Sequence, residues 1–433
     1  MPILVLLALL LAWPMLGAAT VRIDLTAANT QPLPVALTPF VASDTEGSKL
    51  GEQIVEVITA NLADSGLFKP INRQAFLQTP EAMAAQGPDF QQWRQLKAEA
   101  LLVGTVTMTG ESARVEFRVF DPFQEKQIVG RRYTASRQFW RHIAHRIADD
   151  IYAALTGETG YFTTRIAYIG QTRRAEGGWA KKLCVMDQDG GNNQCLTDGS
   201  HLVLTPRFSP TAQQIVYMSY ATGQPRLYLL DLPTGEQEIL GDFPGLNSSP
   251  RFSPDGRKIA MTLTHDEEGN PDIYVMDIRN RIPRRLTDSR AIDTSPSYSP
   301  DGRQIVFNSN RAGKPALYIM DNDGGNVRRL TYGDGRYYAP AWSPRGDLIA
   351  FVKEMRGRFH IGVIDPEGNE ERILTDSFMD DSPSWSPNGR VILFGRDEGR
   401  QSWLYSIDLS GYNLKKIPTP AQATDPSWSG LLR

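Results

Sequence analysis

Histidine and cysteine are scarce in this chain of 433 residues, which contains 5 histidines and 2 cysteines. The sequence also lacks a Gly-x-Ser-x-Gly nucleophile elbow and a glycine-rich phosphate-binding loop. The 46 basic residues are balanced by 49 acidic ones, so neither nucleic acid nor a strongly basic partner is indicated. We therefore expect no enzyme, no catalytic residues, no cofactor and no metal site.

Two short motifs contain residue types that can bind metals. His142 and His145 lie three positions apart on a predicted helix, but no further ligand is near in sequence, so a solvated helix face is the preferred interpretation. The Asp-x-Asp-Gly runs at 187–190 and 321–324 lack the later ligands of a calcium-binding loop. We interpret them as hairpin turns.

The N-terminus consists of an uncharged apolar run at 3–13 and the small residues at 17–19. This pattern is typical of a secretory signal peptide, with cleavage after Ala19. The run is shorter than the roughly 20 residues that a membrane-spanning helix needs. No lysine or arginine precedes it, so a retained anchor or a buried helix remains an alternative. We expect residues 1–19 to be the signal peptide of an exported protein.

The two cysteines, Cys184 and Cys195, flank an Asp-Gly step at 189–190, which is a strong hairpin-turn signal. Pairing of the flanking strands would bring the sulfurs together, and an oxidising compartment would permit a disulfide. The alternative is two free thiols on neighbouring strands.

A short phrase occurs six times in the C-terminal part of the chain: proline, any residue, an aromatic residue, serine and usually proline. The copies follow one another at intervals of 43 to 46 residues, which suits one four-stranded propeller blade. They lie at 206–210, 250–254, 296–300, 340–344, 383–387 and 426–429.

One repeat unit, at 296–339, contains a Ser-Pro-Asp-Gly turn and predicted strands at 304–307, 316–321 and 327–331. We expect the next phrase to begin the fourth strand. The first unit, from Ile166, lacks a preceding phrase, and the last phrase, at Pro426, lacks a following unit. We therefore expect the C-terminal strand to complete the first blade of a six-bladed β-propeller at 158–433.

The preceding region predicts a small α/β domain at 33–157. Alternating or buried apolar runs indicate strands at 35–40, 100–106, 113–120 and 127–133, and apolar residues at helical spacing indicate helices around 54–62 and 137–155. The fold class is thus mixed, with an α/β domain followed by an all-β propeller. We expect a hinge at 157–160 and a separate partner-binding segment at 20–32.

The residues just before each phrase differ from blade to blade. We expect them at one end of the disc, around the channel mouth, where their aromatic, acidic and hydroxyl side chains suit protein recognition. Idiosyncratic loop sequence is the alternative. The candidate rim residues are Leu246, Asn247, Ser249, Asp293, Thr294, Tyr337, Tyr338, Asp380, Asp381 and Asp425.

The order of these parts, together with blade strands such as Tyr-Val-Met-Asp at 274–277 and Arg-Arg-Leu-Thr at 284–287, resembles the TolB family. Its members are periplasmic propeller proteins of the Tol-Pal system, and the resemblance covers essentially the whole chain. It implies a non-enzymatic role in outer-membrane integrity and in invagination during cell division. It also implies two partners, the lipoprotein Pal and the inner-membrane-anchored protein TolA.

The resemblance places Pal at the channel mouth, chiefly at Leu246, Ser249 and Thr294. It places TolA at the segment just after signal cleavage, which keeps a Val-Arg-Ile core and otherwise diverges. By its own pattern, this alternating segment can pair with the sheet edge of another protein or fold back onto its own domain. The residues of this predicted TolA contact are Val21, Arg22, Ile23, Asp24, Leu25 and Thr26.

Two other functions compete with this interpretation. One is a glycan-binding or peptidoglycan-binding propeller, in which Tyr337, Tyr338, Trp342 and Trp385 would stack on sugars. The other is a propeller lyase or lactonase, which would need convergent carboxylates, histidine or a metal inside the channel; the repeat supplies aspartates there but no histidine. We expect a monomer that reaches the envelope membranes through its partners.

Overall fold

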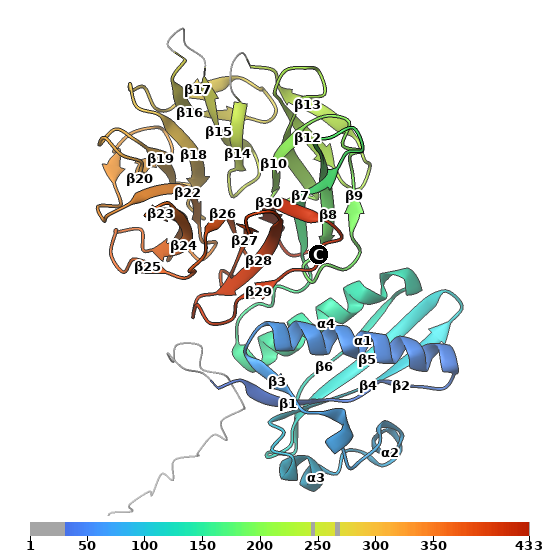
Figure 1. Ribbon diagram of the computed structural model, residues 1–433. Helices are drawn as coiled ribbons and strands as arrows, with labels where there is room; N and C mark the ends of the chain where they lie inside the picture. Colours follow the sequence, from blue (N-terminus) through green and yellow to red (C-terminus); the bar gives the residue numbers. More distant parts are fainter. Residues whose placement is uncertain (1–30, 244–246, 265–268, 433) are drawn as a thin grey trace, which may run out of the picture. The chain divides into compact units, whose positions relative to one another are not determined.

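The computed structural model describes residues 31–243, 247–264 and 269–432 (Figure 1). The signal peptide and the segment at 21–26 lie outside the described residues. The chain divides into two compact units, residues 1–157 and 158–433. No helix of the described part is long and apolar enough to cross a membrane.

The first unit is built on a mixed sheet with the strand order β3-β1-β4-β5-β6, in which β2 also pairs with β4. Strand β1 runs parallel to β3 and β4, whereas β4, β5 and β6 are antiparallel. The strands are β1 (Leu33–Leu37), β2 (Val41–Ala42), β3 (Phe68–Pro70), β4 (Ala100–Thr109), β5 (Ser112–Asp121) and β6 (Lys126–Ser136).

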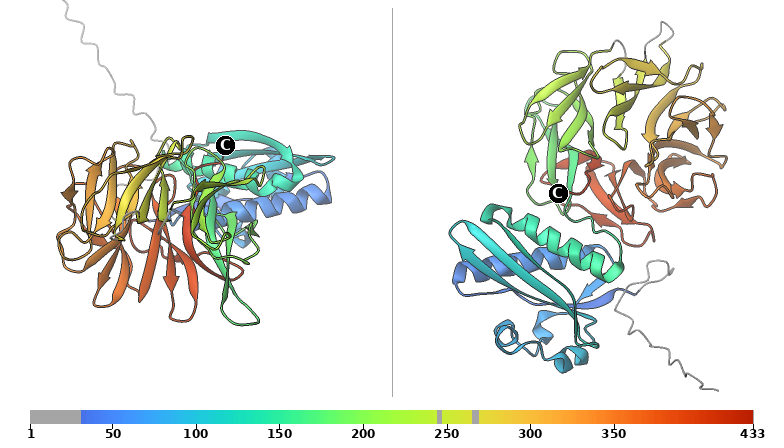
Figure 2. Two further views of the ribbon diagram at one scale, coloured as in Figure 1. Left: turned by 90° about the horizontal axis from the view of Figure 1, so that it is seen from above. Right: turned by 180° about the vertical axis from the view of Figure 1, so that it is seen from behind.

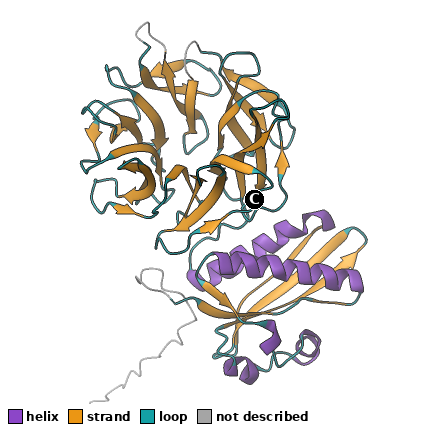
Figure 3. Cartoon of the chain, in the orientation of Figure 1, coloured by secondary structure: helices purple, strands orange, loops and turns teal. Residues whose placement is uncertain are grey.

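Two long helices, α1 and α4, lie side by side on one face of this sheet (Figures 1 and 3). Their apolar residues recur at helical spacing and are buried, as Ile54 and Ile58 show for α1 and Ile147 and Ile151 for α4. The helices are α1 (Thr45–Asp64), η1 (Arg73–Ala75), α2 (Pro80–Gln86), α3 (Phe90–Gln95), η2 (Arg137–Phe139) and α4 (Trp140–Thr156).

The short helices α2 and α3 were not predicted from the sequence. Met83 of α2 and Trp93 of α3 pack with Ala36 of β1 and Leu101 of β4 in a small apolar cluster. Each of these helices buries only one residue, so no hydrophobic period was available to predict them.

In the second unit, the described strands form six four-stranded blades around a central axis (Figure 2). The blades are β30-β7-β8-β9, β10–β13, β14–β17, β18–β21, β22–β25 and β26–β29, and a single pairing of Phe359 with Met379 joins the last two into one eight-stranded sheet. The innermost strands are β10 (Val203–Phe208), β14 (Asn247–Phe252), β18 (Asp293–Tyr298), β22 (Arg336–Trp342), β26 (Met379–Trp385) and β30 (Gln422–Trp428). The second strands are β7 (Arg165–Arg173), β11 (Gln214–Ser219), β15 (Lys258–Thr264), β19 (Gln304–Ser309), β23 (Ile349–Met355) and β27 (Val391–Asp397).

The outermost, fourth strands are shorter than the other three. The third strands are β8 (Trp179–Asp187), β12 (Arg226–Asp231), β16 (Pro271–Asp277), β20 (Ala316–Asp321), β24 (Arg358–Ile364) and β28 (Ser402–Asp408). The fourth strands are β9 (Gln194–Cys195), β13 (Gln237–Gly241), β17 (Pro283–Arg285), β21 (Arg328–Arg329), β25 (Arg372–Ile373) and β29 (Lys415–Lys416). Apolar side chains of neighbouring blades pack together, because a single blade cannot bury both of its faces.

The predicted ring closure is confirmed. Strand β30 pairs antiparallel with β7, with Trp428 opposite Ile166, so the last strand completes the blade that the first propeller strands begin. The backbone N–H of Ser429 also donates to the carbonyl of Arg165 at 2.9 Å.

The position of the phrase within a blade differs from the prediction. Each phrase ends the innermost strand of its own blade and does not begin a fourth strand, so the sequence unit at 296–339 crosses a blade boundary. The Ser-Pro-Asp-Gly turn then leads to the second strand. The hydroxyl of Ser299 donates to Asp301 at 2.6 Å, and Gly302 has a φ of +72°, which glycine adopts without steric cost.

Candidate functional site

The residue immediately before each phrase proline has an unusual backbone conformation. All six have φ between +45° and +56°, and in each blade the pairing register between the innermost and second strands shifts at this point. This is a β-bulge repeated in every blade. Positive φ is uncommon outside glycine, and such strain clusters at functional sites. The six residues are Thr205, Ser249, Ser295, Ala339, Ser382 and Asp425.

All six bulge residues line one cavity of about 360 Å³, which we call the bulge cavity. Thr294, Tyr338 and Asp381, each two positions before a phrase proline, also line it. Five of the predicted rim residues therefore meet in one place: Ser249, Thr294, Tyr338, Asp381 and Asp425.

Three other predicted rim residues are not on an exposed rim. Asp293, Tyr337 and Asp380 are each three positions before a phrase proline, and their exposed fraction is 0%. The prediction places whole stretches around the channel mouth, whereas in the structure they are the first halves of the innermost strands. Side chains alternate along a strand, so these residues point into the blades while their neighbours reach the channel.

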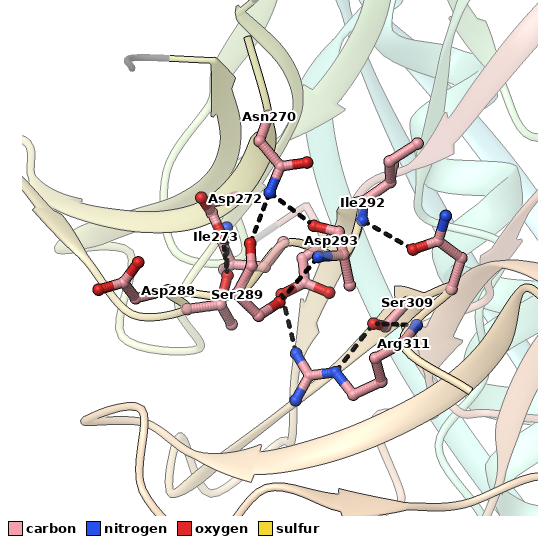
Figure 4. A network of polar contacts seen from close by, with 12 residues as sticks. Asn270, Asp272, Ile273, Asp288, Ser289, Ile292, Asp293, Ser309 and Arg311 are labelled. Carbon is pink, nitrogen blue, oxygen red and sulfur yellow. Dashed lines mark hydrogen bonds and ion pairs between the residues drawn. The ribbon is translucent and has the colours of Figure 1, made fainter. Parts of the chain in front are cut away.

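Asp293 illustrates this inward position (Figure 4). Its carboxylate accepts hydrogen bonds from Arg311 at 2.8 Å and from the hydroxyl of Ser289 at 3.4 Å. Arg311 also donates through Nε to Ser309 at 2.9 Å. These contacts bind the start of β18 to the surrounding strands and loops, so Asp293 has a structural role.

Asp380 and Tyr337 are held in comparable ways. Arg396 donates to both oxygens of Asp380, at 2.7 and 2.9 Å. The hydroxyl of Tyr337 donates to Glu371 at 2.8 Å, and burial raises the pKa of Tyr337. Leu246 lies outside the described residues, and of Asn247 only the backbone, in β14, is described.

The bulge cavity has an unusual electrostatic character. The side chain of Asp381 lines the cavity and is surrounded by protein. This burial raises the pKa of Asp381, and the negative charge of the nearby Asp425 raises it further. Its Oδ1 accepts a hydrogen bond from the backbone N–H of Ser382 at 2.6 Å. Burial lowers the pKa of Arg207, another lining residue, to about 10, against the opposing effect of Asp425 and Asp381.

Exposed apolar side chains lie at the beginnings of three innermost strands, and one of them, Met379, lines the bulge cavity. Leu202, Ile292 and Met379 each lie four positions before a phrase proline, and their exposed fractions are 40%, 47% and 37%. Phe378, beside Met379, is 60% exposed. Sequence reasoning missed them as site residues, although counting back from each proline would have found them. Apolar side chains exposed together on a polar surface are typical of protein-binding sites.

A second cavity, of about 440 Å³, is lined mainly by the phrases themselves. We call it the phrase cavity. Its tryptophans Trp342, Trp385 and Trp428 are only 7% to 9% exposed, and Trp385 donates through Nε1 to the carbonyl of Ala341 at 2.8 Å. Tyr337 is fully buried. Most of the aromatic faces that a stacked sugar would need are thus covered, which weakens the glycan-binding alternative.

The two cysteines are placed on paired strands. Cys184 of β8 lies directly opposite Cys195 of β9, and their sulfurs are joined in a disulfide. The Asp-Gly step between them forms the expected turn, in which Gly190 has a φ of +87°.

From Glu158 onward, the predicted hinge at 157–160 forms hydrogen bonds with residues of the propeller. Glu158 accepts hydrogen bonds from Arg390 at 2.7 Å and from Arg345 at 3.1 Å, and these arginines lower its pKa. Asn388 donates to the carbonyl of Thr159 at 3.1 Å.

The interpretation of His145 as a solvated residue is wrong, because it is buried and its Nδ1 lies 2.8 Å from the amide of Asn61.

Comparison with known families agrees with this architecture. Residues 152–432 match the TolB beta propeller domain, and residues 21–128 match the TolB amino-terminal domain. The chain belongs to the TolB family. The predicted α/β domain and propeller are thereby confirmed.

Among TolB relatives, the Tol-Pal system protein TolB of Paramagnetospirillum magneticum (strain ATCC 700264 / AMB-1) is 46% identical over 217 residues. That match covers 50% of this chain and 48% of the relative. The Tol-Pal system protein TolB of Pelagibacter ubique (strain HTCC1062) is 48% identical over 234 residues, which are 51% of each chain. The matched part of this chain thus spans about half the length of these curated relatives.

The crystal structure of TolB from Acinetobacter baumannii matches with a TM-score of 0.82 at 28% identity, and the match covers 94% of this chain and 99% of that one. The names of the two curated relatives designate a protein of the Tol-Pal system, which agrees with the expectation that the chain is not an enzyme.

Proposed function

We propose that this chain is a periplasmic adaptor of the Tol-Pal system. In this proposal it binds the lipoprotein Pal at the channel mouth and TolA through the segment at 21–26. It thereby contributes to outer-membrane integrity and to invagination during cell division. Export by the N-terminal signal peptide, with cleavage after Ala19, would place it in the periplasm.

The observation that carries the proposal is the composition of the channel mouth. Leu202, Ile292 and Met379 are exposed apolar residues at the beginnings of innermost strands, and Met379 lines the bulge cavity together with small hydroxyl residues and Asp381. An apolar contact area around a few polar groups is the usual composition of a specific protein interface. The bulge residues supply a fixed, preformed backbone, which lowers the entropic cost of docking.

A single charged substitution tests the Pal contact. Ile292→Glu places a carboxylate at the mouth, and we expect it to weaken binding of the soluble domain of the cognate Pal at least tenfold, about 1.4 kcal/mol. The matched control is Ile282→Glu, which alters an isoleucine that is 71% exposed beside β17. Calorimetric titration of both variants measures the difference. Equal affinities for the two variants and the native chain would exclude this mouth as the Pal contact.

The TolA contact is tested by deleting residues 21–26. We expect binding of TolA to be lost while the domains remain folded, because the deleted residues precede β1, the first strand of the described part of the chain. Measuring Pal affinity in the same variant asks whether the segment communicates with the propeller. Unchanged TolA binding would remove the segment from the proposal, and unchanged Pal affinity would exclude coupling between the two contacts.

Two further experiments address the function in the envelope. A strain that lacks the chain should release periplasmic proteins into the medium and divide with delayed invagination. Purified peptidoglycan free of proteins should not retain the chain. Retention on that material, without any protein partner, would favour the glycan-binding alternative.

A further inference from the structure

The residue immediately after each phrase's first proline forms a second ring inside the channel. Four of these six residues are small, and two are arginines on adjacent blades. All six line the phrase cavity. They are Arg207, Arg251, Ser297, Ala341, Ser384 and Ser427.

The three serines of this ring have an internal partner. The hydroxyl of each accepts a hydrogen bond from the backbone N–H of an aromatic residue in the next blade, at 2.9 to 3.1 Å. The arginines cannot play this role, because a guanidinium group has no acceptor. Arg207 and Arg251 instead extend far enough to line both the phrase cavity and the bulge cavity, and they are the two residues that these cavities share. They therefore lie at the boundary between the cavities.

Part of each guanidinium group has no partner. Among the described residues, neither Nε of Arg207 nor Nη1 of Arg251 forms a hydrogen bond, although both atoms are buried. Nη1 of Arg207 donates only to the carbonyl of the adjacent Pro206, at 2.6 Å. Burying a cation without a compensating charge or hydrogen bond is costly. Two such groups at one level of a channel therefore indicate a site for a negatively charged ligand.

The acidic residues of the bulge cavity do not form ion pairs with these two arginines. Asp381 and Asp425 influence the pKa of Arg207 through space, but neither forms an ion pair with an arginine within the described part of the chain. Burial disfavours the charged form of Asp381. Asp425 receives hydrogen bonds from the hydroxyls of Ser382 and Thr424, both at 3.4 Å.

We propose that Arg207 and Arg251 bind a small oxyanion, of the phosphate or carboxylate class, inside the propeller channel. The planar guanidinium fork suits such a ligand because it donates two parallel hydrogen bonds to paired oxygen atoms. The small residues elsewhere in the ring leave space, and both adjoining cavities are larger than a phosphate ion. The ligand is a free solute, and its binding requires no partner protein, so the proposal is independent of the Pal contact.

The test uses the full mature chain in buffer free of phosphate, sulfate and carboxylates. Inorganic phosphate is titrated at constant ionic strength while the heat of binding and the thermal midpoint are recorded. We expect saturable binding and a rise in the midpoint, since a ligand that binds only the folded state stabilises it. The double variant Arg207→Gln/Arg251→Gln should bind at least tenfold more weakly. Arg303→Gln, which alters a strongly exposed arginine, should bind like the native chain.

Because the measurement is the response to phosphate, a change in the absolute stability of a variant does not affect it. The single variants Arg207→Lys and Arg251→Lys keep the charge and remove the fork, so we expect intermediate affinities. A crystal soaked in selenate should show anomalous density between the two arginines. Absence of phosphate binding by the native chain, an equal response of all variants, or anomalous density elsewhere only would overturn the proposal.

Discussion

The hydroxyl oxygen of Ser427 accepts a hydrogen bond from the backbone N–H of Phe208 at 3.0 Å, although 219 positions separate the two residues in the chain. Ser384 makes the same contact with Trp428 at 2.9 Å. Each bond joins the innermost strands of two neighbouring blades. The bond of Ser427 joins the last strand of the chain to β10, so it supports the ring closure together with the pairing of β30 and β7.

Replacing Ser427 with alanine should destabilise the propeller. The buried N–H of Phe208 loses its acceptor, and an unsatisfied buried donor costs about 1–3 kcal/mol. Urea denaturation followed by tryptophan fluorescence measures the change. Ser200→Ala, which removes an exposed hydroxyl, should change the free energy of unfolding by less than about 0.5 kcal/mol. Equal effects of the two substitutions would show that the bond does not support ring closure.

The disulfide is the next contact to test. If the protein is exported, the unreduced chain should weigh two hydrogen masses less than the reduced chain. Replacing Cys184 and Cys195 with alanine opens a loop with a sequence separation of 11 residues, and we expect a loss of up to about 3 kcal/mol. Intact-mass measurement and urea denaturation provide the two readouts. Free thiols in the unreduced protein would contradict this expectation.

The features that could be predicted from the sequence are those that recur with a regular period. The repeat of about 44 residues and the unpaired phrase at Pro426 were sufficient to predict six blades and their closure, because each blade repeats one turn and one apolar pattern. The position of the strand start within each blade was not predictable in this way. It is determined by the bulge before each proline, and the bulge residues do not share one side-chain type, as Ser295, Ala339 and Asp425 show.

The same limitation explains the errors in the candidate site. Asp293 and Thr294 are adjacent and both polar, so the sequence gives no reason to separate them. In the structure, Asp293 is buried against Arg311, whereas Thr294 lines the bulge cavity. Only the strand alternation, counted back from the phrase proline, distinguishes the two positions. Arg207 and Arg251 lie on adjacent blades, and only the structure shows that a buried nitrogen of each guanidinium group has no hydrogen-bond partner among the described residues.

Asp380 provides a test of the buried ion pairs. Asp380→Asn leaves Arg396 without its charged partner in a buried site, and breaking such a pair typically costs about 3–5 kcal/mol. We expect a lower urea midpoint with little change in the affinity for Pal of the fraction that remains folded. Unchanged stability combined with weaker Pal binding would instead place Asp380 at the docking surface, as the sequence alone had suggested.

The neighbouring residue, Asp381, should behave in the opposite way. Burial raises the pKa of Asp381 in the folded state above its unfolded value, so the folded state favours the protonated carboxyl. The protonated carboxyl of Asp381 therefore contributes its full stabilisation at a pH below the unfolded pKa. This stabilisation is lost as the pH rises through the folded pKa. Asp381→Asn removes this loss and keeps an acceptor for the N–H of Ser382. At neutral pH we expect the variant to be at least as stable as the native chain.

The pH dependence of the stability difference distinguishes the raised pKa of Asp381 from a change in packing as the cause. The stability difference between Asp381→Asn and the native chain should increase as the pH rises from below the unfolded pKa to neutrality, when both are unfolded in urea at each pH. Asp376→Asn is the matched control, because its carboxylate is 86% exposed and it pairs with Arg358 at the surface, at 3.4 Å. Its stability difference should stay nearly constant over the same range, since exposed pairs contribute little. A constant difference for Asp381→Asn as well would show that the cavity does not disfavour a charged carboxylate.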